Sequence, residues 1–327
     1  MILMGHGAGG RLSSDLISNH FLPRFQSATL SQLADSAVIG DLALTTDSYV
    51  VTPRQFPGGD IGRLSIAGTV NDLTMVGARV LGITAAFIIE EGFALQELDA
   101  IVASMAETAK EAGVEIVAGD TKVVPRGACD GLFITTSGLG RLDAHFRPMP
   151  HRAVVGDAVL CTGTLGDHGM AVMVKREGLG FEGELTSDVA PLCGLLDLLR
   201  DLGDDVHVLR DPTRGGAVQS LLEVANASAV RISLEEAAIP VRRAVRTACE
   251  LLGIDPLYVA NEGKALVCVP EGSADEVLRR LRSHPYGEEA VKIGHVVPGR
   301  PGCELRSEFG GLRSLRMATG EILPRIC

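Results

Sequence analysis

The sequence predicts an α/β (α+β) protein of two domains. The chain has 327 residues, about the length of two average domains. Hydrophobic residues make up 46% of it but aromatic residues only 4%, so Ala, Val, Leu and Ile must fill the core. Segments with strand and helix character follow one another along the chain, which is typical of α/β and α+β folds.

Charge and cysteine content narrow the function classes. The net charge of −11 argues against nucleic acid or an anionic membrane as the principal partner. The seven cysteines are scattered and form no CxxC pair, which disfavours a disulfide framework and a zinc site. The first residues lack the features of a signal peptide, and the longest apolar run, 83–89, is too short to cross a bilayer. We therefore expect a cytoplasmic location.

The first half of the chain predicts a glycine-rich segment (1–32) and an ATP-binding and dimerisation domain (33–147). Gly5, Gly7 and Gly10 match GxGxxG, but the strand that must precede a dinucleotide-binding loop has no room. The segment is either a flap whose amides, at Gly7 and Gly9, close over phosphates or a disordered end. Hydrophobic spacing predicts the following elements of the domain: strands at 33–39, 42–47, 114–118 and 132–136, and helices at 63–75 and 95–112.

The second half predicts a C-terminal α/β domain (151–298) and a mobile tail (299–327). Proline-rich residues 147–150 mark the boundary between the two domains. Strands are expected at 157–161 and 206–209, and helices at 191–202, 217–226, 241–252 and 274–282. The run Pro-Gly-Arg-Pro-Gly from Pro298 begins the tail, which ends in the reactive Cys327.

Acidic residues recur where strands are expected to end. Asp47, Asp120 and Asp211 each follow a strand, and Asp72 stands beside Asn71 on a helix. Carboxylates are ligands that Mg²⁺ prefers and shares with substrate phosphates. Each acid alone has a structural interpretation as a helix cap or turn residue. Four of them, with Thr121, Lys122, Arg214 and Glu262 in similar settings, predict a magnesium–nucleotide enzyme without a P-loop.

A series of motifs resembles a known family along nearly the whole chain. The motifs are GHGAGG (5–10), TTDSYVVTP (45–53), FPGGDIG (56–62), GTVNDL (68–73), VAGDTKV (117–123), GDHG (166–169), DPTRGG (211–216), NEG (261–263) and PRIC (324–327). Together they resemble the HypE family, the carbamoyl dehydratases of nickel–iron hydrogenase maturation. The acidic and glycine motifs also fit the wider superfamily of aminoimidazole ribonucleotide and selenophosphate synthetases, and the PRIC ending narrows the resemblance to HypE. Asp35-Ser36 departs from the expected pattern, which leaves the part of Asp35 in nucleotide binding open.

The resemblance implies a homodimer that pairs its N-terminal sheets and holds ATP and Mg²⁺ near that interface. It also implies two partners: the carbamoyltransferase HypF, which loads a carbamoyl group onto Cys327, and a HypC–HypD complex, whose iron receives the cyano group. Between these steps, ATP activates the carboxamide oxygen and the S-carboxamide is dehydrated to a thiocyanate, the source of the cyanide ligand.

The same resemblance assigns roles to residues. The expected metal ligands are Asp47, Asp72 and Asp211, with Asp120 as a fourth. The expected nucleotide-binding residues further include Asp35, Asn71, Thr121, Gly7 and Gly9. Glu262 is the first candidate for the general base, and Lys122 is its electrostatic partner. His6 and His168 are weaker catalytic candidates, because a lone histidine in a glycine loop is more often a hydrogen-bonding group.

Two alternatives remain open. The first alternative to the dehydratase is an ATP-dependent synthetase of the same superfamily that acts on a free small molecule. The second is a carrier that presents a modified thiol without catalysis. The synthetase would keep its turnover when Cys327 is replaced. The carrier would hydrolyse no ATP in a manner that depends on Asp72 or Asp211.

Overall fold

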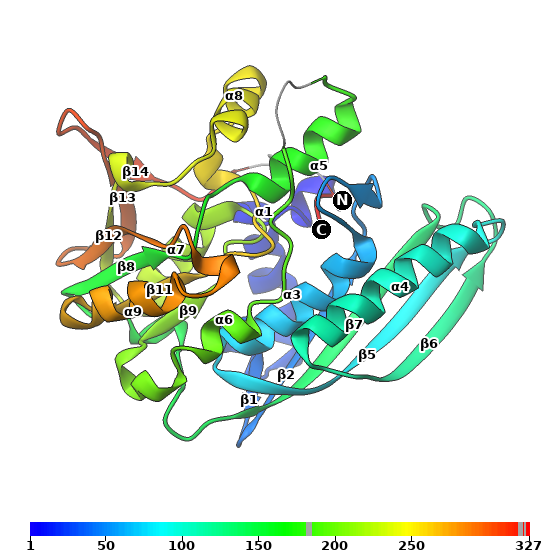
Figure 1. Cartoon of the computed structure of the whole chain (residues 1–327), viewed down its shortest axis with the longest axis horizontal. Helices are drawn as coiled ribbons and strands as arrows, with labels where there is room; N and C mark the ends of the chain where they lie inside the picture. The colour runs from blue at the N-terminus through cyan, green and yellow to red at the C-terminus, as the bar shows by residue number, and fades with distance from the viewer. Residues whose placement is uncertain (181–184, 320–322, 324) are drawn as a thin grey trace.

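The computed structural model describes residues 1–327 except 181–184, 320–322 and 324. Two β-sheets dominate it, one in each half of the chain, with helices between and around them (Figure 1). The first 32 residues form short helical turns: a 3₁₀ turn at Met4–His6, α1 (Gly10–Leu16), a π turn at Ile17–Phe21, α2 (Leu22–Phe25) and a 3₁₀ turn at Leu30–Gln32. The glycine-rich N-terminal segment is therefore largely helical.

The N-terminal sheet has five strands in the order β1-β2-β7-β5-β6. Its strands are β1 (Ala37–Ile39), β2 (Leu42–Tyr49), β5 (Ala78–Glu90), β6 (Ile116–Val124) and β7 (Leu132–Leu142). The pair β5–β6 is parallel, because helix α4 (Leu95–Ala112) crosses over between these strands, and the other pairs are antiparallel. A separate two-stranded ribbon joins β3 (Gln55–Phe56) to β4 (Gly59–Asp60). The order puts β1 and β6 at opposite edges of the sheet.

Helix α3 (Ile61–Met75) lies at the centre of the molecule. Thirteen of its fifteen residues are buried, so the helix is covered nearly all round. It packs against β2, β5, β7 and α4 on the side of the N-terminal sheet, and it also contacts α6 and β9 of the second half. Asp60 begins the helix: its carboxylate accepts hydrogen bonds from the Arg63 N–H and from the Ser104 hydroxyl, each at 2.8 Å.

The C-terminal sheet has seven strands in the order β14-β13-β10-β12-β8-β11-β9. Its strands are β8 (Asp157–Cys161), β9 (Val208–Arg210), β10 (Arg231–Glu235), β11 (Leu266–Pro270), β12 (Val291–Val297), β13 (Gly302–Arg306) and β14 (Leu312–Leu315). The helices of this half are α5 (Asp167–Glu177), α6 (Cys193–Asp197), α7 (Gly216–Ala227), α8 (Arg243–Leu252) and α9 (Ala274–Leu281). Helix α7 contacts β10 and β13, α9 contacts β8 and β12, and separate apolar clusters lie beneath these helices.

Four expectations about the elements differ from the structure. Residues 33–36 of the expected strand 33–39 lie outside β1, and the helix expected at 191–202 divides into α6 and a 3₁₀ segment at Arg200–Asp205. The other two concern the tail and β6. The tail was expected to begin at residue 299, but β13 and β14 follow that point and belong to the sheet. The Pro-Gly-Arg-Pro-Gly run is a turn that carries the chain from β12 across β10, where β13 pairs in parallel. The strand expected at 114–118 continues to Val124 as β6, so Asp120 lies inside a strand and not beyond it.

The helix expected at 95–112 is confirmed. Its apolar spacing places Ile101, Met105 and Ala109 on the buried face, and Gly113 ends it in the left-handed conformation at φ 68°. Within the described residues, the structure contains no helix that is both long and apolar enough to cross a membrane.

The cap at Asp60 yields a stability prediction. Replacing Asp60 by Ala leaves the Arg63 N–H and the Ser104 hydroxyl without their acceptor, which costs about 1–2 kcal/mol of folding free energy. For a chain of this size we expect the melting temperature to fall by about 2–4 °C per kcal/mol, measured by differential scanning calorimetry. Asp41→Ala is the matched control, because that side chain is 72% exposed. An unchanged melting temperature for Asp60→Ala would contradict the assignment of the cap.

Candidate active site

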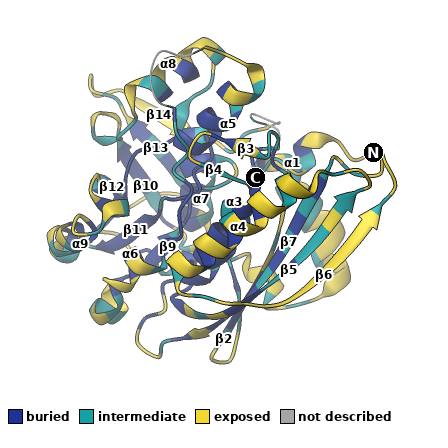
Figure 2. Cartoon of the chain, turned by 45° about the vertical axis from the view of Figure 1, so that its right-hand side comes forward, coloured by how far each residue is buried: buried dark blue, intermediate teal, exposed yellow. Residues whose placement is uncertain are grey.

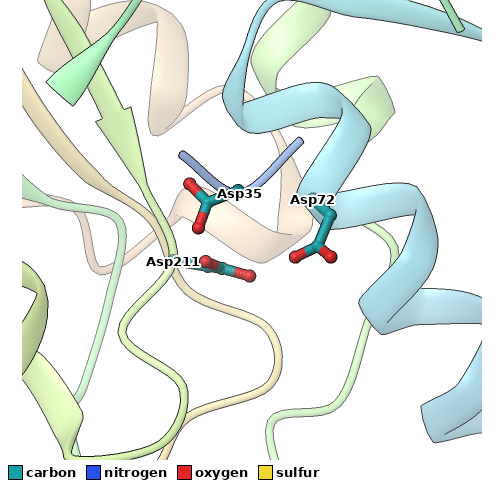
Figure 3. Close-up of side chains that lie close together, drawn as sticks. All are labelled: Asp35, Asp72 and Asp211. Atoms are coloured by element: carbon teal, nitrogen blue, oxygen red, sulfur yellow. The ribbon is translucent and has the colours of Figure 1, made fainter. Parts of the chain in front are cut away.

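Three carboxylates converge where the two halves of the chain meet. Asp35 comes from the segment before β1, Asp72 from α3, and Asp211 from the residue after β9 (Figure 3). One carboxylate oxygen of each lies within 4.8 Å of the others. The Thr45 hydroxyl donates to Asp72 Oδ2 at 2.7 Å and fixes that side chain. The cluster therefore combines both domains in one site.

The three acids repel one another and are poorly solvated. Burial is the largest cause that raises the pKa of Asp211, to about 8, and the charge of Asp35 adds to it. Burial and the charges of Asp211, Asp35 and Asp47 raise the pKa of Asp72 well above its usual range. The pKa of Asp35 is also raised, although the Arg210 guanidinium opposes the shift. Such a set of oxygen donors fits a divalent cation, which removes the repulsion when it binds.

Two arginines supply the positive charge around this cluster. Arg210, at the end of β9, forms ion pairs with Asp35 and with Glu223 of α7. Arg214 lies 3.8 Å from Asp47, measured from Nη2 to Oδ1, and its Nη1 donates to the Gly7 carbonyl at 3.4 Å. Arg210 holds one acid of the cluster in place, and Arg214 connects the cluster to the N-terminal segment.

Glu262 faces the same region from the loop before β11. Its side chain is 4% exposed, and Oε1 has no hydrogen-bond partner among the residues that the structure describes. Burial raises its pKa well above the usual value, Asp211, Asp188 and Asp47 raise it further, and Arg214 lowers it. An unpartnered buried carboxyl with a raised pKa is a stronger base than usual once it is ionised, and it then takes a proton from a substrate.

Asp188 holds the loop that carries Glu262. Its two carboxylate oxygens accept the N–H groups of Glu262 at 3.2 Å and Gly263 at 3.1 Å. It also lies 3.4 Å from the Lys264 ammonium. A Cβ on Gly263 would approach the Asp188 carbonyl to 1.7 Å, so only glycine fits there. Asn261 fixes the other end of the loop, because its side chain bonds Gly166 N–H and the carbonyls of Pro212 and Val259.

The structure places Asp47 beside the cluster and turns Asn71 away from it. Asp47, on β2, is close enough to raise the pKa values of Asp72, Asp211 and Glu262, but it is not one of the three convergent acids. The Asn71 amide instead bonds backbone groups of residues 190, 192 and 262, at 2.8 to 3.4 Å. Asn71 therefore joins α3 to the loop of Glu262, a role that differs from the expected contact with phosphate.

Asp120, Thr121 and Lys122 lie far from the cluster within one chain. They stand on β6, at the sheet edge opposite to β1 and β2, and all three are exposed. The Lys122 ammonium pairs with Asp120 at 2.7 Å, which lowers the pKa of that carboxyl. Asp120, the expected fourth metal ligand, therefore does not reach the acidic cluster of its own chain. The same holds for Lys122, the expected partner of Glu262.

The two ends of the chain border one cavity of about 460 Å³ next to the acids. The residues that line it include Met4, Gly7, Ser48, Arg214 and Cys327. Gly9 has φ 77°, and a Cβ there would lie 3.2 Å from Arg214, so the glycine lets the N-terminal segment approach the 211–216 loop. The His6 ring bonds the backbone of Leu3 in its own turn, and the His6 carbonyl accepts the Ser13 hydroxyl at 2.8 Å.

The described end of the tail is docked in this cavity. Ile326 is 4% exposed within an apolar cluster, and Cys327 packs at its border. Burial raises the pKa of the Cys327 thiol to about 12; Arg214 lowers it, and Glu262 and Asp47 raise it. Pro324 lies outside the described residues. The thiol thus lies within the electrostatic influence of Glu262, the predicted base, and of Asp47, with the last residues held in place.

Comparison with known proteins gives the family. Two family models match, the N-terminal domain of AIR synthase related proteins at residues 33–142 and the C-terminal domain at 154–304. The carbamoyl dehydratase HypE of Cupriavidus necator is 49% identical over 99% of this chain and 94% of its own length. The chain belongs to the HypE family of carbamoyl dehydratases.

Solved structures of HypE proteins match the fold. HypE in a HypE–HypF complex is 48% identical, covers 93% of this chain and 99% of that one, and superposes with a TM-score of 0.90. HypE in complex with ATP is 46% identical, covers all of both chains and has a TM-score of 0.85. The two-domain α/β fold expected from the sequence is confirmed by these matches.

Sequence reasoning missed two residues of this HypE site. Arg210 carries no signal beyond its place before Asp211, and Asp188 lies in an irregular segment between α5 and α6. Both act through contacts distant in sequence, Arg210 with Asp35 and Asp188 with the Glu262 loop. Only the three-dimensional fold brings these partners together.

The raised pKa of Asp211 predicts a pH-dependent stability. Its pKa in the folded chain, about 8, exceeds its usual value of 3.8, so its favourable contribution to stability is present at low pH and is lost as the pH rises toward 8. Asp211→Asn removes this loss. We compare the melting temperatures of the variant and the wild type in EDTA at about pH 6 and about pH 9. The variant should exceed the wild type at the higher pH by a few degrees more than at the lower pH. Asp41→Asn is the control, and an equal gain at both pH values would refute the prediction.

Proposed function

We propose that this HypE protein dehydrates a carbamoyl group carried on its own Cys327. In this scheme ATP is consumed, and the S-carboxamide of Cys327 becomes a thiocyanate, the source of a cyanide ligand. The observation that carries the proposal is the docked tail: Cys327 borders the cavity beside Arg214, where Glu262 and Asp47 act on its thiol. The substrate is thus part of the chain that holds the catalytic groups.

The reaction balances with the groups at this site. The carboxamide oxygen attacks the γ-phosphorus of ATP and releases ADP, which turns a poor leaving group into phosphate. The nitrogen loses one proton to solvent as the iminophosphate forms; the C–O bond then breaks and the second N–H proton leaves, so that S–C≡N and inorganic phosphate form. We assign the acceptance of that proton to Glu262, whose buried Oε1 has no partner in the described part of the chain. Arg214, between Glu262 and Asp47, suits the negative charge that develops on oxygen.

The acidic cluster fits a magnesium ion that accompanies ATP. Asp35, Asp72 and Asp211 offer oxygen ligands within 4.8 Å of one another, and Asp47 lies beside them. When it is bound, Mg²⁺ neutralises charge on the phosphates during phosphoryl transfer. Gly7 and Gly9, in the segment over the cavity, are the proposed contacts to phosphate. The HypE relative crystallised with ATP supports nucleotide binding.

We further propose a homodimer in which β6 of the partner subunit supplies Asp120, Thr121 and Lys122. The first eight residues of β6 are exposed, and Figure 2 shows this edge strand in the exposed colour. The apolar side chains of Val117 and Val123 on it are 60% and 68% exposed. An unpaired apolar edge strand favours pairing with another chain. This arrangement accounts for the distance between Lys122 and the acidic cluster of its own chain.

The proposed partners follow from the route of the carbamoyl group. HypF loads the group onto Cys327, a step that the HypE relative crystallised with HypF supports. A HypC–HypD complex then receives the cyano group on its iron. Both steps require the tail to leave its dock and return, since residues 50–52 and helix α5 hold the docked peptide.

Mass spectrometry of the C-terminal peptide tests the proposed function. After carbamoylation with HypF, we expect the peptide to lose the mass of one water on Cys327 only when Mg-ATP is added. Glu262→Gln should bind ATP but keep the carboxamide, because the amide cannot accept the proton. A carboxamide that persists in the wild type would favour a thiol carrier. ATP turnover that survives in Cys327→Ala would favour a synthetase that acts on a free small molecule.

Mixed dimers test the origin of Lys122. Lys122→Ala and Glu262→Gln should each be nearly inactive alone. If Lys122 acts across the dimer, random mixing gives one intact site in each heterodimer, and we expect about a quarter of wild-type turnover. Chains mixed without subunit exchange provide the control. Activity that stays at the level of the separate variants after exchange would mean that each chain needs its own Lys122.

A further inference from the structure

The last three residues of the chain lie beside residues 50–52 and form two backbone hydrogen bonds with them, with Arg325 in the left-handed conformation at φ 46°. The Val50 N–H donates to the Cys327 carbonyl at 3.3 Å, and the Thr52 N–H donates to the Arg325 carbonyl at 3.2 Å. The two segments run in opposite directions, because Val50 bonds Cys327 and Thr52 bonds Arg325. These bonds fix direction and spacing, but backbone pairing alone permits a shift of the peptide by two residues.

Helix α5 contributes two further donors to the carbonyls of the same peptide. His168 Nε2 lies 2.9 Å from the Ile326 carbonyl. Arg176 donates from Nη2 to the Arg325 carbonyl and from Nε to the Thr52 carbonyl, each at 2.6 Å. His168 and Arg176 are eight residues apart, about two helical turns, and so share one face of α5. The peptide is therefore held between the 50–52 segment and α5.

The hydrogen bonds around His168 define which nitrogen carries the proton. Ser187 Oγ accepts the Val189 N–H at 3.1 Å, so its own hydrogen is free to point at His168 Nδ1, 2.8 Å away. Nδ1 is then an acceptor, and Nε2 carries the hydrogen that is donated to Ile326. The ring is fully buried, with Phe56 packed edge-on at 5.2 Å between ring centroids. Burial also lowers the pKa of His168, although Asp188 opposes this, which favours the neutral ring.

Side chains complete the recognition of the tail. Ile326 fills an apolar cluster that contains Val172 and Ala260. The Arg325 guanidinium contacts Asp130 at 2.6 Å and the Val50 carbonyl at 2.9 Å. With these two residues placed, the Cys327 side chain is left at the border of the cavity that Arg214 lines.

We propose that His168 is a positioning residue that sets the register of the docked tail by binding the carbonyl immediately before Cys327. Both of its ring nitrogens are engaged, and neither faces the acids, so it acts through the tail and not as an acid or base. One donor of fixed length on a rigid helix selects a single register, in which the thiol stands beside Arg214 and within the influence of Glu262. The importance of this placement for catalysis rests on the proposed function of Cys327. The docking of the tail does not rest on that function.

Alkylation of the full-length protein tests the docking without any carbamoyl chemistry. Iodoacetamide is added at about pH 8, where free thiols react readily, and Cys327 modification is followed by mass spectrometry. Removing one buried hydrogen bond in His168→Ala should raise the alkylation rate of Cys327 roughly fivefold. His168→Gln places an amide N–H at the position of Nε2 and should restore a rate near that of wild type. Ser187→Ala, which frees the ring to turn, should raise the rate about twofold.

The buried cysteines 161, 249, 268 and 303 report on the fold in the same spectra. They should stay unmodified in every variant while Cys327 reacts. If His168→Ala loosens the fold and exposes these cysteines, the test rests on Ser187→Ala and His168→Gln, because both substitutions leave a side chain of similar volume in the core. A wild-type rate at Cys327 in Ser187→Ala, or a rate in His168→Gln as high as in His168→Ala, would overturn the proposal.

Single-turnover dehydration links the register to the chemistry. After carbamoylation, His168→Ala should form thiocyanate more slowly than wild type at saturating Mg-ATP, with KM for ATP unchanged and the rate recovered in His168→Gln. Equal rates in wild type and His168→Ala would mean that the register does not serve the reaction. If the alkylation result holds but the wild type forms no thiocyanate, the proposed function fails and the tail dock stands.

Discussion

The site depends on carboxylates that are buried together with little positive charge to balance them. One carboxylate oxygen of each of Asp35, Asp72 and Asp211 lies within 4.8 Å of the others; Asp35 and Asp72 are half-buried and Asp211 is buried, and Glu262 adds a further buried acid nearby. Arg210 and Arg214 compensate in part, and the raised pKa values of these acids reflect what remains. A folded chain tolerates this arrangement because two packed domains hold the acids on rigid elements, and a cation with its nucleotide completes it.

Helix α3 makes that arrangement possible. It is buried almost all round, carries Asp72, and contacts elements of both halves of the chain. Asn71, one residue before, ties the helix to the backbone of residues 190, 192 and 262. The base and one acid of the cluster are thereby attached to the same helix. A change in the packing of α3 moves both together.

Local patterns predicted the elements better than the contacts between them. Helix α4 follows from apolar spacing and its terminal glycine, and Asp211 follows from its place after a strand. The sequence predicts Asp120 just after a strand, but β6 continues to Val124 and Asp120 lies within it. The polar and apolar residues of 116–124 give no local signal of that length. The role of Asn71 and the dock of Arg325–Cys327 depend on partners more than 100 residues away, which no window of sequence reveals. The turn at 298–302 looked like a linker because proline and glycine serve both purposes.

The dock has a chemical consequence for a protein that is its own substrate. A free small-molecule substrate is replaced by diffusion when it is damaged, but a thiol at residue 327 is not. Peroxide and disulfides attack the thiolate, and burial raises the pKa of the Cys327 thiol to about 12, which leaves almost no thiolate at neutral pH. The seated tail thus lowers the fraction of reactive thiolate between cycles, while the Cys327 side chain itself stays partly exposed.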